Sequence, residues 1–479
     1  MARPAEPYYL ALDQGGHSSR ALVFSADGIV IARAQRAVAT HSPHSGWVEQ
    51  DAQVLVDSLR AVIAEVHATL GKHAKQVCSA GLATQRSNCV CWDRRDGRTL
   101  SPALSWQDRR AQAWLEALPL DDAWLRARTG LQRSPHYGAS KMRWCLDHLP
   151  AVREAASAGH LACGPLASYL LTRLLRERPC LIDPANAARS LLWNLGEHDW
   201  DDELLTLFGV AREHLPRCVN SNHDYGSLAW GDTYIPLRIT SGDQSAALYA
   251  GGIPRTDTLY INLGTGAFLQ RSVTTPWPLA DGLLASIVYA EVARADYVHE
   301  ATVNGAGTAF DWAREHLGLH DIETCLATWL DTVGEIPVFL NGVAGLGSPW
   351  WRAHFVTRFI GPGAAWAQAV AIAESIVFML LENMQLLQDT SPVQRIQISG
   401  GLAQLDGLCQ RLADLSGVCV ERSTQTEATA AGIAWLLATP AVGSWRGTDV
   451  VVFTPQENPA CYARYQGWRA AMSQALLGG

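Results

Sequence analysis

Two apolar stretches, each broken by a short glycine turn, lie about half the chain apart. Residues 8–14 and 18–24 flank the turn Gly15-Gly16-His17, and residues 258–263 and 267–269 flank Gly264-Thr265-Gly266. A β-branched and aromatic run, a glycine tip and a second apolar run predict a β-hairpin. Such a tip turns its backbone N–H groups into one concavity that binds phosphate, although a glycine hairpin alone is most often only a tight turn.

The remaining hydrophobic periodicity predicts alternating helices and strands. After Asp51 the apolar positions repeat every three to four residues and predict a helix that Gly71 closes. The apolar stripe of this helix is Val54, Leu55, Leu59, Val62, Ile63, Val66 and Leu70. A strand is expected over residues 77–83, and residues 107–208 are expected to be mainly helical.

A new α/β pattern begins near residue 235. Residues 236–240 predict a strand, and Asp243 is expected at the N-cap of a helix that ends at Ala250. The elements expected after the second hairpin are a helix over 308–316, a strand over 396–399, and helices over 402–415 and 428–437. We place a lobe boundary near residues 240–243.

Composition narrows the possible classes of protein. The 479 residues are 48% hydrophobic and carry a net charge of −8, with a pI of about 6.0 and no basic stripe, so a nucleic-acid partner is not expected. The N-terminal segment lacks the apolar run of a signal peptide. The apolar stretch over 364–387 includes Glu374 and Glu382, which favours a buried helix over a membrane span. Eleven dispersed cysteines without a CxxC pair are typical of reduced cytoplasmic thiols, and their spacing does not support a cysteine-bound metal.

Two common nucleotide-binding loops are absent from the sequence. It contains no GxxxxGK[ST] segment and no strand-linked GxGxxG segment. The Gly264-Thr265-Gly266 turn runs on into Ala267 and Phe268, so it does not match the dinucleotide fingerprint.

A set of short segments, in order along essentially the whole chain, resembles the FGGY family of carbohydrate kinases, and its glycerol kinases most closely. The segments are Asp13-Gln14-Gly15, Ser18-Ser19-Arg20, Gly46 to Asp51, Thr84-Gln85-Arg86, Ser105 to Arg110, Gly242-Asp243-Gln244, Gly264-Thr265-Gly266, Gly345 to Pro349 and Gly400-Gly401. The resemblance implies the two-lobed α/β, actin-like and ribonuclease H-like ATPase fold of the sugar kinase, Hsp70 and actin superfamily. It implies an N-terminal lobe over 1–241 for substrate and phosphate, and a C-terminal lobe over 242–479 for nucleotide, with the catalytic base at its start.

The resemblance implies transfer of the ATP γ-phosphoryl group to a hydroxyl of a sugar or polyol, with Mg²⁺ as cofactor. Asp243 matches the base that accepts the hydroxyl proton, and its position at a helix start favours the ionised carboxylate. Helix capping is the plain alternative for Asp243. Asp13 matches a residue on the Mg²⁺ side, with Asp243 as the second metal-side carboxylate, whereas an Asx turn is the plain alternative for Asp13.

The resemblance also assigns residues to the phosphates of ATP. Arg20 matches a phosphate-side arginine, although an exposed strand cation is the alternative reading. Gly16 stands where the family has Thr, and His17 after it is either a phosphate contact or a solvated turn residue. The full phosphate-side set is Gly15, Gly16, His17, Ser18, Arg20, Gly264, Thr265, Gly266, Gly307 and Gly401.

Substrate recognition is where the sequence departs from glycerol kinases. The substrate-side set is Arg86, Ser87, Trp106, His136, Asp243 and Gln244. Glycerol kinases have Glu where this chain has Ser87, and their substrate tyrosine lies where this chain has His136. A serine offers one short hydroxyl where a carboxylate accepts two hydrogen bonds, so we expect a ketose or a larger polyol rather than glycerol.

Two other functions stay open at this point. One is a kinase-like regulatory protein that binds sugar and nucleotide with weak or no turnover, although Asp13, Arg20 and Asp243 together favour the enzyme. An Hsp70-like or actin-like ATPase is a weaker alternative, because nothing after the second lobe resembles a substrate-binding domain and the Arg86 and Trp106 segments resemble those of small-molecule kinases. Leu405 replaces an adenine-side Asn of the family and leaves nucleotide affinity open. The resemblance allows a homodimer or homotetramer.

Overall fold

The structure is a computed structural model that describes residues 6–332, 334–388, 391–424, 427–441, 445 and 449–478. The chain divides into two units, each assembled from three segments. Unit 1 contains residues 1–254, 286–297 and 427–447, and unit 2 contains residues 255–285, 298–426 and 448–479. The division into lobes at residues 241 and 242 stays a prediction.

The first predicted hairpin lies inside the main sheet of unit 1. The strand order is β13-β14-β5-β1-β2-β3, with β1 antiparallel to β2 and parallel to β5, and β5 parallel to β14. The strands are β1 (Tyr8–Gln14), β2 (Ser18–Ser25), β3 (Val30–Ala37), β5 (Val77–Thr84), β13 (Asn222–Trp230) and β14 (Thr233–Gly242). The hairpin predicted around residues 15–17 is therefore confirmed, as is the strand predicted over 77–83.

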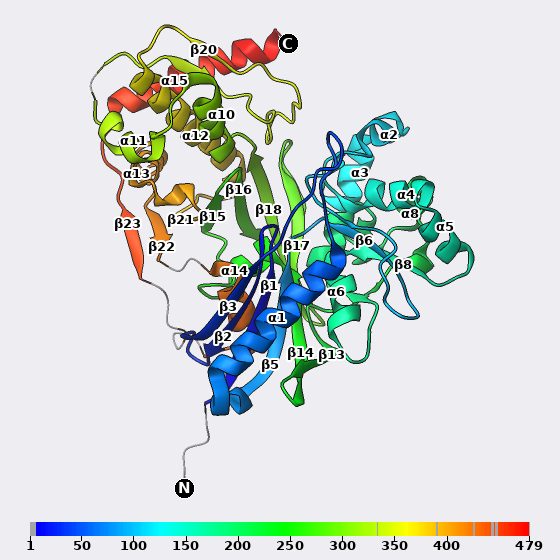
Figure 1. Cartoon of the computed structure of the whole chain (residues 1–479). Helices are drawn as coiled ribbons and strands as arrows, with labels where there is room; N and C mark the ends of the chain where they lie inside the picture. The colour runs from blue at the N-terminus through cyan, green and yellow to red at the C-terminus, as the bar shows by residue number, and fades with distance from the viewer. Residues whose placement is uncertain are drawn as a thin grey trace. The chain divides into compact units, whose positions relative to one another are not determined.

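Helices cover both faces of this sheet. Leu10 and Leu12 of β1 share one core with the buried face of α1 (Ala52–Leu70) and with α6 (Leu166–Leu174). Successive residues of a strand point to opposite faces of the sheet, so Gly81 of β5 faces away from the side on which its neighbours Ala80 and Leu82 pack. On that opposite side Gly81 lies against Ile433 of α14 (Ala428–Ala438). Figure 1 shows α1 lying across β1–β3. The segment that carries α14 therefore belongs to unit 1, although it comes late in the chain.

The region after the main hairpin is mainly helical, as predicted, but it also contains short strands. One of them, β8 (Leu161–Pro165), pairs antiparallel with β6 (Cys89–Asp93) in a small sheet of order β4-β7-β6-β8. The helices are α2 (Gln112–Ala117), α3 (Asp122–Thr129), α4 (Gly138–His148), α5 (Pro150–Ser157), α7 (Pro184–Ala187) and α8 (Asp202–Phe208). The short strands are β4 (Glu49–Gln50), β7 (Ala103–Leu104), β9 (Leu181–Ile182), β10 (Trp193–Asn194), β11 (Asp199–Trp200) and β12 (Arg217–Cys218).

Unit 2 repeats the same local plan around the second predicted hairpin. The sheet order is β17-β18-β16-β15-β21-β22-β23, and β15 is antiparallel to β16 and parallel to β21, as β1 is to β2 and β5. The tip of the β17–β18 hairpin, residues 286–297, is assigned to unit 1. The strands are β15 (Thr258–Leu263), β16 (Ala267–Val273), β17 (Leu284–Glu291), β18 (Arg294–Val303), β21 (Arg395–Ser399), β22 (Val420–Ser423) and β23 (Val450–Phe453). A separate pair is formed by β19 (Val338–Leu340) and β20 (Arg358–Ile360).

The apolar stretch predicted to be a buried helix is α12 (Ala365–Leu387), and most of its residues are buried in the core of unit 2. In the part of the chain that the structure describes, α12 is the one helix long and apolar enough to cross a membrane, and 83% of its most apolar window is buried inside the protein. The core of unit 2 is completed by α10 (Gly307–Leu317), α11 (Ile322–Leu330), α13 (Asp406–Ser416) and α15 (Pro459–Leu477). All eleven cysteines are free thiols.

Three local predictions need correction. Val54 is 48% exposed and Val56 takes its place in the buried stripe of α1, because Val54 lies on the outer side of the helix. The helix after Asp243, α9 (Asp243–Ala247), ends three residues earlier than expected. The helix expected over 402–415 is a 3₁₀ turn, Leu402–Gln404, followed by α13, because Leu405 has extended backbone angles that interrupt the helix.

Candidate active site

Asp243 lies where β14 ends and α9 begins. It is the first residue of α9, and Gly242 holds the N-cap position that was predicted for Asp243. The Gln244 backbone N–H donates to Asp243 Oδ1 at 2.7 Å, and Arg86 Nε lies 4.0 Å from the same oxygen. Burial raises the pKa of Asp243, and the Arg86 guanidinium opposes that rise. The carboxylate is thus held by a backbone N–H and a buried cation, while about a quarter of its side chain stays exposed.

Gly242 makes room for Arg86. A Cβ atom at residue 242 would lie 2.4 Å from Cδ and 2.5 Å from Cγ of Arg86, well inside contact distance. We expect Gly242→Ala to push the Arg86 side chain away from Asp243 and to lower kcat/KM by about tenfold, the scale of one weakened interaction with a charged group. Steady-state kinetics beside a circular dichroism spectrum of the folded variant check this. Unchanged kcat/KM would show that the Arg86–Asp243 spacing is not needed.

Three substrate-side residues form one wall of unit 1. The rings of Trp106 and His136 lie 5.4 Å apart, and Asn88 Oδ1 accepts a hydrogen bond from the Trp106 backbone N–H at 2.8 Å. Ser87 is buried, and its Oγ has no hydrogen-bond partner among the described residues. Its backbone φ of +66° lies in the left-handed region, which only a well-supported loop holds for a non-glycine residue.

Lys141 supplies that support. Its buried ammonium on α4 donates to the carbonyl oxygen of Ser87 at 3.0 Å and also to the carbonyl oxygen of His136. Burial lowers the pKa of Lys141 to about 7. Burial, together with the charges of Arg189 and Lys141, lowers the pKa of His136 well below its usual range, so the imidazole is neutral. One side chain therefore holds both Ser87 and His136, the two residues expected to change the substrate preference.

Asp13 and Arg20 face each other across the first hairpin. They are partners in the β1–β2 register, and Arg20 Nη1 lies 3.5 Å from Asp13 Oδ2. The same Nη1 atom lies 3.2 Å from Oε2 of Glu427, the residue that precedes α14. Burial and the negative charge of Asp243 raise the pKa of Asp13 to about 7, while Arg20 opposes the rise. Two carboxylates, those of Asp13 and Glu427, thus meet one arginine in unit 1.

The turn of the first hairpin is tied into its surroundings. Gly15 N–H donates to the carbonyl of Ser18 at 3.0 Å, and the Gly16 carbonyl accepts from Gln50 Nε2 at 2.9 Å. His17 is exposed, and its carbonyl accepts from the Val38 backbone N–H at 2.9 Å. The backbone N–H of Gly15, one of the groups expected to bind phosphate, is therefore already hydrogen-bonded inside the turn.

The phosphate-side residues predicted in the second half meet within unit 2. Gly307 N–H donates to the carbonyl of Gly264 at 3.0 Å, and Thr308 N–H donates to the carbonyl of Thr265 at 3.1 Å. A Cβ atom at Gly307 would lie 2.9 Å from Gly264 O, so only glycine allows the start of α10 to approach the turn this closely. Gly401 follows β21, the parallel neighbour of β15, and space around its Cα is open.

The metal-side residues fit a magnesium ion of the kind used with nucleotides. No group of three or more His, Cys, Asp or Glu side chains in the described ranges converges into a closed metal cage. Mg²⁺ beside phosphates needs no such cage, because it keeps several waters and takes one or two carboxylates. Asp13 and Asp243 are close enough for the charge of one to act on the other, which matches that donor set.

Comparison with known proteins identifies the family to which the chain belongs. The profile of the FGGY family of carbohydrate kinases, N-terminal domain, matches residues 8–250, and that of the C-terminal domain matches residues 259–441. The chain belongs to the FGGY family of carbohydrate kinases. This FGGY kinase is 33% identical to a glycerol kinase of Alcanivorax borkumensis over 98% of each chain. It is 36% identical to one of Trichlorobacter lovleyi over 92% of this chain and 91% of the relative.

Solved structures confirm the predicted fold class. A glycerol kinase of Plasmodium falciparum with ADP matches with a TM-score of 0.89 at 20% identity over 98% of each chain. A xylulose kinase of Rhodospirillum rubrum matches with a TM-score of 0.85 at 21% identity, again over 98% of each chain. The FGGY kinase is accordingly a phosphotransferase with an alcohol group as acceptor, and ATP is its cosubstrate.

Three residues of the FGGY kinase join this site without having been predicted there. Lys141 lies on α4, Arg189 lies in a segment expected to be helical, and Glu427 precedes a helix 407 residues after Arg20. Arg189 is buried, lies 5.4 Å from the Tyr137 ring and donates to Ser286 Oγ at 2.8 Å. Nothing in local sequence distinguishes a buried cation from a solvated one, so packing alone reveals these residues.

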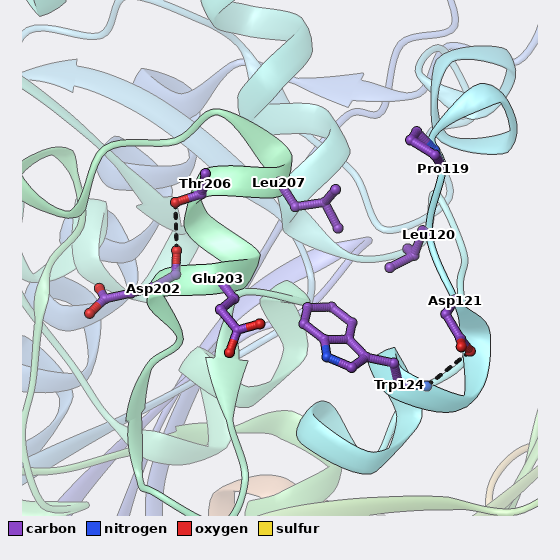
Figure 2. A pocket seen from close by; sticks show the side chains of 8 residues that line it. All are labelled: Pro119, Leu120, Asp121, Trp124, Asp202, Glu203, Thr206 and Leu207. Carbon is purple, nitrogen blue, oxygen red and sulfur yellow. Dashed lines mark hydrogen bonds between the residues drawn. The ribbon is translucent and has the colours of Figure 1, made fainter.

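A separate groove lies on another part of unit 1. Figure 2 shows the Trp124 indole of α3 facing Leu207 of α8 across it, with carboxylates at the rim. Its volume is about 620 Å³, and it is lined by Pro119, Leu120, Asp121, Trp124, Asp202, Glu203, Thr206 and Leu207. None of the predicted site residues lines this groove, so it is distinct from the candidate active site.

Proposed function

We propose that this FGGY kinase transfers the ATP γ-phosphoryl group to a hydroxyl of a ketose or of a polyol larger than glycerol, with Asp243 as general base. The observation that carries the proposal is the setting of Asp243, a partly exposed carboxylate beside the buried Arg86 at the start of a helix. A carboxylate in that setting can accept the proton of a bound hydroxyl as the phosphoryl group leaves ATP. Because the transition state is loose, a weak base is sufficient.

Each unit supplies its own part of the chemistry. In unit 1, Arg86, Trp106 and Gln244 are proposed to orient the substrate, while Ser18, Arg20 and the glycine turn contact phosphate. In unit 2, the turn at residues 264–266, with Gly307 and Gly401, is proposed to hold nucleotide phosphates. Mg²⁺, held by Asp13 and Asp243 with waters, would neutralise charge on the phosphate oxygens. We also propose a cytoplasmic location, which suits eleven free thiols.

The substrate preference follows from Ser87 and His136. The buried Ser87 hydroxyl lacks a partner among the described residues, so a substrate hydroxyl that bonds to it relieves the cost of an unpaired polar group. The neutral His136 imidazole offers one donor and one acceptor beside the Trp106 ring. The relatives named glycerol kinase make glycerol the main rival substrate.

We expect glycerol to be a poor substrate. Each missing hydrogen bond to a glycerol hydroxyl costs roughly 1 kcal/mol, which is about fivefold in kcat/KM. Ser87→Glu should restore an acceptor and raise kcat/KM for glycerol about tenfold relative to the parent. If glycerol gives the highest kcat/KM of a panel of polyols and ketoses, the proposed preference is wrong.

ADP release across that panel also separates the enzyme from a regulatory protein. An enzyme gives rapid, substrate-dependent ADP release with at least one member. A regulatory protein of the same fold would bind sugar and nucleotide, seen as a rise in the melting temperature, yet release ADP no faster than the protein alone. That second result would overturn the proposed function.

A further inference from the structure

The start of α14 brings a carboxylate and a hydroxyl to the site from the far end of the chain. Glu427 is paired with Arg20 of β2, and Thr429 Oγ1 donates to the backbone carbonyl of Asp243 at 3.3 Å. The helix is anchored closely, because a Cβ atom at Gly432 would lie 1.7 Å from the carbonyl oxygen of Ala246 in α9. Only glycine permits that approach, so the position of Glu427 is fixed by packing rather than by a flexible loop.

Arg20 is shared between two carboxylates. Its Nη1 atom is 3.2 Å from Glu427 and 3.5 Å from Asp13, and the Asp13 carboxylate is the more buried of the two acids. The Nη1 atom donates a hydrogen bond to Glu427 and approaches Asp13 only as an ion pair, so the single positive charge of Arg20 is divided between the two acids. Without Glu427, Arg20 would be free to pair with Asp13 alone, the partner directly across the hairpin.

We propose that Glu427 is a positioning residue of the phosphoryl-transfer site, which draws the Arg20 guanidinium toward itself so that the Asp13 carboxylate is only partly neutralised and remains available to a divalent cation. This inference rests on the proposed function, because it takes Asp13 as a metal-side residue. Glu427 acts through Arg20 and does not itself contact the ion.

A double-mutant cycle in the full-length protein tests the proposal. Calorimetry measures the Kd of Mn²⁺ with the protein saturated by a non-hydrolysable ATP analogue, for the parent, Glu427→Gln, Arg20→Gln and the double variant. Glu427→Gln should weaken Mn²⁺ binding about tenfold, because Arg20 then neutralises Asp13. In the Arg20→Gln background, the second change should alter Kd by less than about twofold. Steady-state kinetics should show an unchanged KM for the sugar.

Glu203→Gln is the matched control, because Glu203 is also paired with an arginine of unit 1, Arg128, away from the site. It should leave Mn²⁺ binding unchanged. Glu427→Asp keeps the negative charge and should retain most of the Mn²⁺ affinity. This variant replaces Glu427→Gln in the test if the glutamine variant does not fold. If Glu427→Gln weakens Mn²⁺ binding equally with and without Arg20, then Glu427 is a metal ligand and the proposal is overturned. The proposal is also overturned if Glu427→Gln does not weaken Mn²⁺ binding in either background.

The parent proposal fails in a different way. If Asp13→Asn leaves the Mn²⁺ affinity unchanged, then Asp13 does not hold the metal ion, and this role of Asp13 in the proposed function is wrong. If Asp13→Asn abolishes Mn²⁺ binding while Glu427→Gln has no effect, only the role of Glu427 is wrong.

Discussion

Asp243→Asn should bind sugar and nucleotide like the parent and turn over at least about 10²-fold more slowly, the usual scale of a lost acid–base group. The amide keeps the shape of the side chain and can still accept the Gln244 backbone N–H, but it cannot take the substrate proton. Initial rates with saturating sugar and ATP give kcat, and calorimetry gives the two binding constants.

The control for this substitution is Asp51→Asn. Asp51 also begins a helix, and its carboxylate accepts from the backbone N–H groups of Gln53 and Val54. It should keep kcat within twofold, because asparagine is as good a helix cap as aspartate. If Asp243→Asn also keeps kcat within a few-fold of the parent, Asp243 serves the helix start and not the chemistry.

Asp13→Asn should stabilise the ligand-free protein at alkaline pH while removing metal-dependent activity. Burial and the charge of Asp243 raise the pKa of Asp13 from 3.8 to about 7 in the folded state. The folded state therefore binds this proton more tightly than the unfolded chain does. The stability it contributes is complete below pH 3.8 and is lost as the pH rises to about 7.

The loss between pH 5 and pH 8.5 amounts to roughly 3 kcal/mol, since it accumulates at about 1.4 kcal/mol per pH unit until Asp13 ionises. Asparagine has no such loss, so the stability difference between Asp13→Asn and the parent should grow by that amount over the interval. Urea unfolding at both pH values, with a chelator present, measures it.

Asp57→Asn is the control for the pH effect. Asp57 is exposed on α1 beside Arg60, so its removal should change stability little and equally at both pH values. A difference between Asp13→Asn and the parent that stays constant with pH would mean that Asp13 is not held at a raised pKa in the folded protein.

Local sequence predicted many of the backbone elements, but it predicted only some of the residues that meet around Asp243 and Asp13. The two glycine hairpins, the strand at 77–83 and the junction before Asp243 follow from turn chemistry and apolar runs, which act over a few residues. The stripe of α1 failed at Val54, because its apolar side chain lies outside the buried face. The extended backbone at Leu405 interrupts the helix that was expected over 402–415. The apolar spacing gave no signal of this interruption.

Sequence by itself determined the family and the two turns and singled out the carboxylates of Asp13 and Asp243 as candidates, because these depend on residue identity and spacing. Tertiary structure decided what surrounds them. It carried α14 back into unit 1, set Glu427 against Arg20, and placed the Lys141 ammonium on the carbonyls of Ser87 and His136. The pKa shifts of Asp13, His136 and Lys141 follow from that packing, because a pKa depends on burial and on neighbours as far along the chain as Glu427 is from Asp13. No local pattern encodes such neighbours, so only the folded chain could reveal them.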